Sequence, residues 1–150
     1  RIAFMDDGQV IQMDSVENIY YQPNHLLCAK YFGKCNVMQG KVQDGLLRIQ
    51  GLCFPVEKVD GEYNVIIRSQ DLYLLKESVD EDFQAKVIEK HFLGDRIEIL
   101  FHWNGKELIG DFVSFEEAEN LKVGDIVSLG IRLEKLILLK EEKKNEESCI

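Results

Sequence analysis

Residues 66–76 read IIRSQDLYLLK, and residues 130–140 read GIRLEKLILLK. Both stretches place an arginine third, Arg68 in one and Arg132 in the other, and both end in Leu-Leu-Lys. Each follows a strand-like run, turns through polar residues and continues as a second apolar run. Such an echo marks a repeated supersecondary unit, and two copies suit a small β-barrel with two similar corners. The alternative is coincidence between apolar strands, in which Leu and Ile recur easily.

The composition describes one ordinary domain, or a domain with appendages. The chain has 150 residues, of which 45% are hydrophobic, so it can build a core. Its formal charge of −9 disfavours a partner with a phosphate backbone. No apolar run reaches membrane-spanning length, and no signal peptide is recognisable. Because the sequence begins at Arg1, directly in an apolar run, we expect it to be a piece of a longer protein.

The cysteines do not form a recognisable framework. Cys28, Cys35, Cys53 and Cys149 include no C-x-x-C pair, and none has a histidine at metal-ligand spacing. Free thiols in a reducing cytosol are therefore predicted. Cys149 does not fit a C-a-a-X lipidation box.

The first 33 residues predict a hairpin and two short helices. The hairpin would turn at Asp6-Asp7-Gly8. Asp14 or Ser15 would cap the first helix, with Glu17 at capping-box spacing, and Pro23 would end it. The second helix would start at Asn24 and close on Gly33 as its C-terminal cap.

From Asn36 onward, the sequence pattern changes to short apolar segments separated by glycine turns. This pattern predicts short strands and is typical of a sandwich or barrel. Asn104-Gly105 is the strongest hairpin signal and predicts a type I′ turn beside a partly buried Trp103. The apolar parity shifts between Val87 and Ile88, which indicates a β-bulge. The expected strands cover residues 37–42, 46–49, 52–56, 63–67, 83–92, 96–103, 106–113 and 126–129.

Three further segments complete the pattern. Ser114-Phe115-Glu116-Glu117 is a capping box that predicts a short helix to Leu121. Residues 78–82 read as a solvated acidic loop, and residues 141–147 lack apolar side chains, which predicts a disordered tail.

The sequence contains no recognisable catalytic motif. The sequence has no G-x-x-x-x-G-K-[ST], no G-x-S-x-G and no H-E-x-x-H, and His25, His91 and His102 are isolated. The acidic residues 80–82 lack the spacing of an EF-hand. We therefore predict no catalytic, cofactor or metal site. The repeated Arg68 and Arg132 would form either a salt bridge at each barrel corner or a contact with an anion or a partner.

Several motifs resemble one protein family. Residues 1–12, RIAFMDDGQVIQ, are similar to the segment after the switch histidine of importer-type ABC ATPases, "DRIaVMxxGxIxQ". Residues 67–71, IRSQD, resemble "giRPEdi", with Ser69 in place of Pro and Gln70 in place of Glu. Because this chain lacks that Pro and that Glu, a function that they serve in the family does not carry over to Ser69 and Gln70. Further matches, in order and at compatible spacing, lie at residues 15–23, 29–33, 93–95 and 121–125.

The resemblance implies a mainly β, OB-like regulatory region, often called a TOBE domain, of an importer ATP-binding subunit. Residues 1–33 would be the end of the ATP-binding domain, residues 34–140 the OB-like region and residues 141–150 a disordered charged tail. The phosphate loop, signature motif and switch histidine are missing. The resemblance thus implies no enzyme activity or cofactor for this fragment, and ATP with Mg in the parent protein.

The same resemblance implies a regulatory and dimerisation role in uptake of ferric iron, a polyamine, an oxyanion or a sugar. Partners would be a second copy and the transmembrane permease, at the inner face of the cell membrane. Candidate regulatory or interface residues are Arg68, Gln70, Asp71, Arg132 and Glu134.

Two other functions compete with this reading. A small-ligand or oxyanion-binding barrel needs converging basic or hydroxyl groups, which the acidic composition disfavours. A nucleic-acid OB-fold needs a basic groove with exposed aromatic side chains. Phe101 and Trp103 alternate into the expected core instead, so no nucleic-acid partner is predicted.

Overall fold

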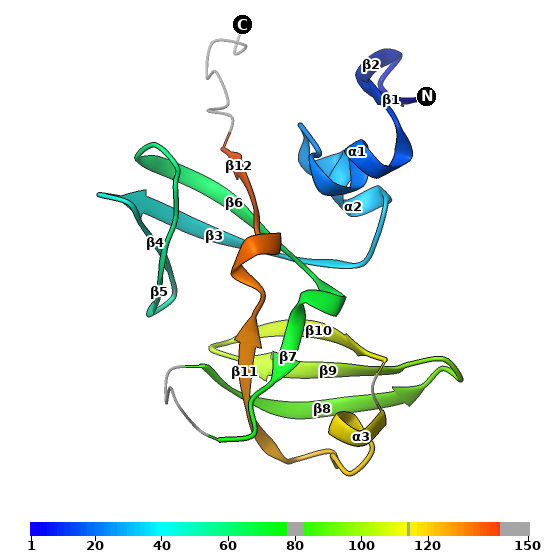
Figure 1. Ribbon diagram of the computed structural model, residues 1–150, viewed down its shortest axis with the longest axis vertical. Coiled ribbons are helices and arrows are strands. Elements are labelled where there is room, and N and C mark those ends of the chain that lie inside the picture. The colour runs from blue at the N-terminus through cyan, green and yellow to red at the C-terminus, as the bar shows by residue number, and fades with distance from the viewer. Residues whose placement is uncertain (78–82, 114, 142–150) are drawn as a thin grey trace, which may run out of the picture.

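The protein is described here from a computed structural model that covers residues 1–77, 83–113 and 115–141. The fold is mainly β, as the sequence predicts (Figure 1). The expected acidic loop at 78–82, the capping serine at position 114 and nearly all of the expected tail lie outside the described residues. The domain boundary at residue 33 stays a prediction.

The chain begins with a hairpin and two short helices, as expected. The elements are β1 (Ile2–Asp6), β2 (Gln9–Asp14), α1 (Val16–Tyr21) and α2 (Leu26–Tyr31). Of the two predicted caps, Ser15 is the one that forms: its side chain accepts a hydrogen bond from the backbone N–H of Asn18 at 3.2 Å. The capping box predicted between Asp14 and Glu17 is therefore wrong, because the helix starts one residue later than that spacing requires. The second helix starts later than predicted, because the His25 imidazole caps it by accepting from Leu27 N–H at 3.1 Å.

Gly33 does not close α2 in the predicted way. Its φ is not positive, so it is not a left-handed C-terminal cap. Its role is spatial: a side-chain carbon there would lie 3.1 Å from the Tyr20 ring and 3.3 Å from Nη1 of Arg68. The missing side chain therefore admits the arginine.

Beyond residue 34, the described strands form two five-stranded antiparallel sheets. We call the sheet of order β12-β6-β3-β4-β5 the first unit and the sheet of order β7-β11-β8-β9-β10 the second unit. The strands of the first unit are β3 (Cys35–Gln43), β4 (Leu46–Ile49), β5 (Leu52–Pro55), β6 (Gly61–Arg68) and β12 (Ile137–Lys140). Those of the second are β7 (Leu72–Leu74), β8 (Gln84–Phe92), β9 (Ile97–Trp103), β10 (Lys106–Phe112) and β11 (Ile126–Ile131).

The two units have the same topology and exchange their last strands. Strand β6 of the first unit continues through a 3-10 turn, η1 (Ser69–Asp71), into β7, which pairs with β11. Strand β11 continues through η3 (Leu133–Lys135) into β12, which pairs back with β6. Figure 1 shows these two connections crossing between the units, one descending and one rising. The echoed stretches are thus the ends of a duplication that covers all five strands.

Matching turns support the duplication. Strands β4 and β5 join through Gln50 and Gly51, with φ of 43° and 94°, and β9 and β10 join through Asn104 and Gly105, with φ of 47° and 76°. Positive φ at both central residues defines the type I′ turn predicted at Asn104-Gly105. The sequence signal of the first turn is weaker, because Gln is a poor indicator of left-handed backbone.

The second unit confirms the predicted bulge and corrects the length of the predicted helix. The bulge is confirmed, since the register of β8 against β9 shifts between Val87 and Glu89 and leaves Ile88 as the additional residue. The helix predicted to reach Leu121 is shorter: α3 spans Phe115–Ala118.

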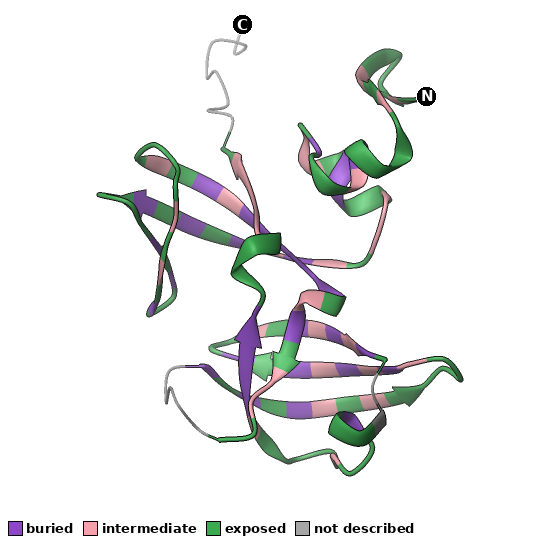
Figure 2. Cartoon of the chain, in the orientation of Figure 1, coloured by how far each residue is buried: buried purple, intermediate pink, exposed green. Residues whose placement is uncertain are grey.

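The core follows the predicted strand alternation (Figure 2). Ile97, Ile99, Phe101 and Trp103 share one buried face of β9, and His102 on the other face is exposed, as predicted. Trp103 is more deeply buried than predicted, with 1% of its surface exposed and its ring packed edge-on against Phe83. These aromatic side chains therefore cannot stack on bases without unfolding the unit.

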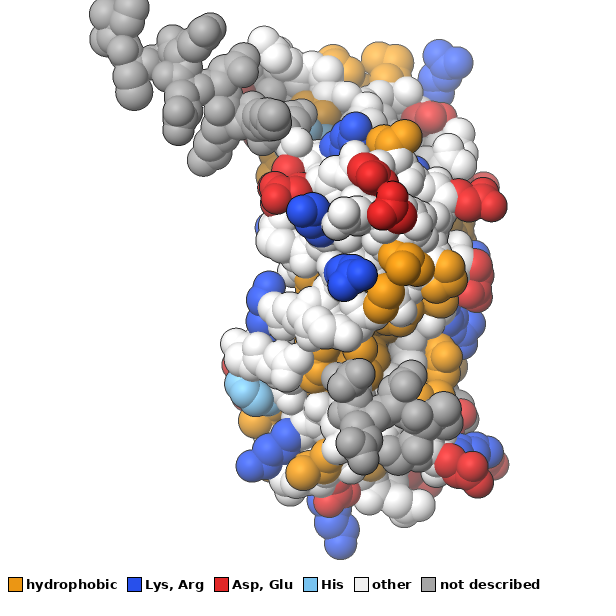
Figure 3. Space-filling view, turned by 90° about the vertical axis from the view of Figure 1, so that its left-hand side faces the viewer, with side chains coloured by type: hydrophobic (Ala, Val, Ile, Leu, Met, Phe, Trp, Pro, Cys, Tyr) orange, Lys and Arg blue, Asp and Glu red, His pale blue; other side chains and the backbone are white. Residues whose placement is uncertain are grey.

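The described surface carries mixed charge. On the face in Figure 3, acidic and basic side chains are interspersed and do not gather into a basic patch. Cys28, Cys35 and Cys53 are free thiols, as predicted, and Cys149 lies outside the described residues. Within the described ranges, no helix is long and apolar enough to span a membrane.

Candidate functional site

The two 3-10 turns, which we call the first corner (η1) and the second corner (η3), lie against each other. The backbone N–H of Arg132 donates to the carbonyl oxygen of Asp71 at 2.9 Å. Strand exchange brings the corners to the same place, because each corner ends a strand of one unit and starts a strand of the other. The predicted site residues are therefore brought to one region of the molecule.

Arg68 is buried, and its contact with an anion or a partner stays a prediction. It is 2% exposed, and its guanidinium donates to backbone carbonyls: Nη1 to Ala29 O at 2.6 Å and to Gly33 O at 3.3 Å, and Nη2 to Tyr20 O at 2.8 Å. The guanidinium carbon also lies 4.2 Å from the centre of the Tyr20 ring. Among the described residues it forms no ion pair, so the predicted salt bridge at this corner is wrong.

The equivalent Arg132 occupies a different environment. Its side chain is exposed, and within the described ranges it makes no hydrogen bond or ion pair. It lines a groove of about 560 Å³ between the first corner, β7 and the end of β10. The local sequence does not reveal this difference, because it arises from residues 16–33, which contact Arg68 from a distant part of the chain.

The remaining predicted residues meet in a second groove, of about 350 Å³, between α1 and both corners. Gln70 donates from its amide to the Tyr20 hydroxyl, and the Lys135 ammonium lies 5.3 Å from the centre of the Tyr21 ring. Asp71 and Glu134 line the same groove. The arrangement is a junction between the N-terminal helices and the two corners.

Asp71 is the perturbed acid of the junction. Burial raises the pKa of its carboxyl above the ordinary value of 3.8, and the positive charges of Arg132, Lys135 and Arg68 oppose that rise. Burial acts because it disfavours the charged form. The ionised carboxylate therefore has a net cost in the folded protein, which its cationic neighbours reduce but do not cancel.

Sequence reasoning missed the polar contacts that join the units near the junction. Ser69 donates to Oδ2 of Asp111 at 2.6 Å, and the ammonium of Lys34 pairs with Glu98. Ser69 stands where the resembled motif has Pro, which has no hydroxyl to donate. The departure thus has a structural use in this chain.

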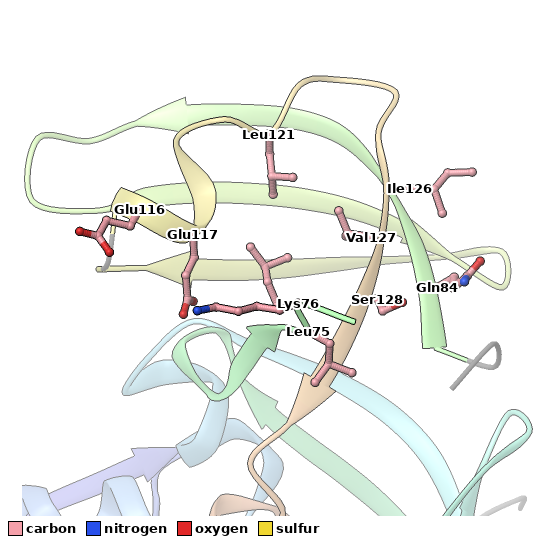
Figure 4. Close-up of a pocket in the computed structure, with 10 residues that line it drawn as sticks. Leu75, Lys76, Gln84, Glu116, Glu117, Leu121, Ile126, Val127 and Ser128 are labelled. Atoms are coloured by element: carbon pink, nitrogen blue, oxygen red, sulfur yellow. The ribbon is translucent and has the colours of Figure 1, made fainter. Parts of the chain in front are cut away.

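A larger pocket lies away from the corners. Figure 4 shows it between the end of β7, the start of β11 and α3, with a volume of about 610 Å³. Lys76 and Glu117 point toward each other across a lining that mixes apolar side chains, such as Leu75 and Leu121, with polar ones, such as Gln84. No pattern in the sequence indicated it, because its walls come from segments far apart along the chain.

The chemistry of these sites is limited. Among the described residues, no three His, Cys, Asp or Glu side chains gather to hold a metal ion. The side chains at the junction donate to backbone carbonyls and aromatic groups. Such an arrangement holds segments together.

Comparisons with known proteins agree with the sequence motifs, although no family model matches the chain. An "Fe(3+) ions import ATP-binding protein FbpC" from Photobacterium profundum is 27% identical over an alignment of 126 residues, which covers 80% of this chain and 36% of the relative. The protein of the same name from Fusobacterium nucleatum is 24% identical and matches 97% of this chain and 38% of the relative. A "Spermidine/putrescine import ATP-binding protein PotA" from Mycoplasmopsis synoviae is 23% identical and matches 96% and 32%.

The chain thus spans about a third of the length of these relatives. Among solved structures, the cytoplasmic molybdate-binding protein ModG is similar in fold, with a TM-score of 0.55 at 17% identity over 71% of this chain and 96% of ModG. Sequence and fold therefore agree: the homologues of this chain are ATP-binding subunits of ABC importers, and its β units have the OB-like fold of the resembled TOBE region.

Proposed function

We propose that the chain is the regulatory and dimerisation region of an ABC importer ATP-binding subunit, without catalytic activity of its own. The observation that carries the proposal is the match of nearly the whole chain to two importer ATP-binding proteins with different solutes. The shared region is then common to the transport machinery, whereas the solute is selected elsewhere. Ferric iron, a polyamine, an oxyanion or a sugar would be the transported solute.

The parent protein would bind ATP with Mg in a domain outside this chain. Residues 1–33 would pack on that domain. Their exposed apolar side chains support this, with Met5, Val10 and Met13 of the hairpin each more than half exposed, at 57%, 52% and 56%. A two-stranded hairpin is marginally stable by itself and needs such a partner. The complex would lie at the inner face of the cell membrane, bound to the permease.

A second copy of the chain would meet the β units. Such a contact would cover apolar side chains that are exposed on the second unit. They include Phe92, Val113, Val123 and Ile126. A contact between identical units would be isologous, with each patch facing its own copy.

An oxyanion-binding barrel remains the second candidate, favoured by the fold similarity to a molybdate-binding protein. Equilibrium dialysis separates the two functions. We expect the chain to bind neither ATP with Mg nor molybdate at micromolar affinity. One molybdate bound per chain would favour the second candidate, and one ATP bound would overturn the non-catalytic assignment.

A further inference from the structure

Arg68 is a cation buried within the protein. Within the described residues no carboxylate pairs with it, and its Nε atom is buried without a hydrogen-bond partner. Taking a charge out of water is costly unless hydrogen bonds replace the lost hydration. The carbonyl groups of Tyr20, Ala29 and Gly33 supply those bonds.

These carbonyls come from the ends of two helices. Tyr20 lies in the last turn of α1, Ala29 lies in the second half of α2, and Gly33 follows α2. Carbonyl groups in the last turn of a helix lack partners within the helix and carry partial negative charge, so a cation is favoured there. One side chain from β6 therefore satisfies both helix ends at once.

The geometry around Arg68 is built for this contact. Gly33 leaves the space that the guanidinium fills, because a side-chain carbon there would be 3.3 Å from Nη1. The Tyr20 ring covers the guanidinium, and Gln70 holds the Tyr20 hydroxyl from the first corner. The helices are thus attached to the strand that leads directly into the corner.

We propose that Arg68 is a positioning residue that locks residues 16–33 onto the first unit, so that the helices and the corners move as one body. The exposed Arg132 shows that the repeated arginine is not required by the β fold itself. The use of this lock rests on the proposed regulatory function: the contact of Arg68 would transmit movement of the β units to residues 1–33.

Hydrogen exchange on the whole chain tests the lock. The reporting amides are Ile19, Gln22, Ala29 and Phe32, whose N–H groups donate within the helical segment. In Arg68→Lys and Arg68→Met we expect them to exchange roughly tenfold faster or more, because the segment opens without unfolding the units. Amides of β9 should keep their protection. Arg132→Met is the matched control and should leave all these amides unchanged.

Two results would overturn the proposal. One is unchanged exchange at the four helical amides in both Arg68 variants. The other is that Arg68 proves to be a general core residue, seen either as equal loss of protection in the helices and in β9 or as failure of both variants to fold. The measurement requires no nucleotide, anion or partner, so its failure is distinguishable from failure of the proposed function.

Discussion

The side-chain amide of Asn36 exchanges hydrogen bonds with the backbone of Ile109. Nδ2 donates to Ile109 O at 3.0 Å, and Ile109 N–H donates to Oδ1 at 2.7 Å. Asn36 belongs to β3 of the first unit and Ile109 to β10 of the second. The buried side chain of Asn36 thus forms the pair of hydrogen bonds that a neighbouring strand would form. It joins the two units at the free edge of β10, whose one strand partner among the described strands is β9.

Replacing Asn36 by Ala should destabilise the protein by about 1–3 kcal/mol, because it leaves partly buried backbone groups of Ile109 without their side-chain partner. Gln39→Ala is the control, since Gln39 is exposed and its side chain bonds Asn64 at the surface, and it should cost less than about 0.5 kcal/mol. Urea denaturation measures both. Equal midpoints for the two variants would contradict this role of Asn36.

The Tyr73 ring lies over Gly130, its cross-strand neighbour in the second unit. A side-chain carbon at Gly130 would overlap that ring, so Gly130→Ala should cost about 1–3 kcal/mol through overpacking. In a Tyr73→Ala background the same change should be neutral or stabilising, since alanine loses less entropy than glycine on folding. A double-mutant cycle by thermal denaturation tests this, and additive effects would be evidence against the overlap.

Asp71 should make stability depend on pH. Its folded-state pKa is raised, so the folded protein binds the proton more readily than the unfolded chain does. The ionised carboxylate therefore costs stability above the folded pKa, and this cost disappears as the pH falls below the ordinary value of 3.8. We expect Asp71→Asn to be more stable than the parent at pH 7, with the difference shrinking toward pH 4. A variant that is less stable at pH 7 would show that the cationic neighbours prevail.

Strand exchange predicts an asymmetric response to truncation. A chain that ends at Leu136 loses β12, which pairs with β6 through Ile137 to Lys140, whereas the second unit keeps all its strands. Amides of β6 should then lose protection from hydrogen exchange while those of β9 retain it. Equal loss in both strands would indicate that the units unfold together whatever strand is removed.

The sequence was informative where structure depends on neighbours along the chain. The type I′ turn at Asn104-Gly105, the bulge beside Val87 and the buried face of β9 follow from local backbone and side-chain preferences. The echo of Arg68 in Arg132 predicted similar corners correctly. It could not predict that one arginine is buried and the other exposed, because helices from residues 16–33 cover only the first.

The exchange of strands between the units could also not be predicted from local sequence patterns. Nothing in residues 72–74 indicates that they pair with β11 rather than return to β6, since both choices bury the same apolar side chains. Asn36 reads as a polar residue at a strand start, and its partner lies 73 positions away. Contacts of this kind depend on how the two units meet.

Association in solution tests the central proposal, that this chain is a dimerisation region, most directly. Light scattering should be recorded at high micromolar concentration on the whole chain and on a version that begins at Lys34, with circular dichroism to verify folding. The account predicts a dimer that survives the truncation, because the contact would lie on the β units. A dimer lost on truncation would place the contact in residues 1–33, and a strict monomer for the whole chain would contradict the proposed function.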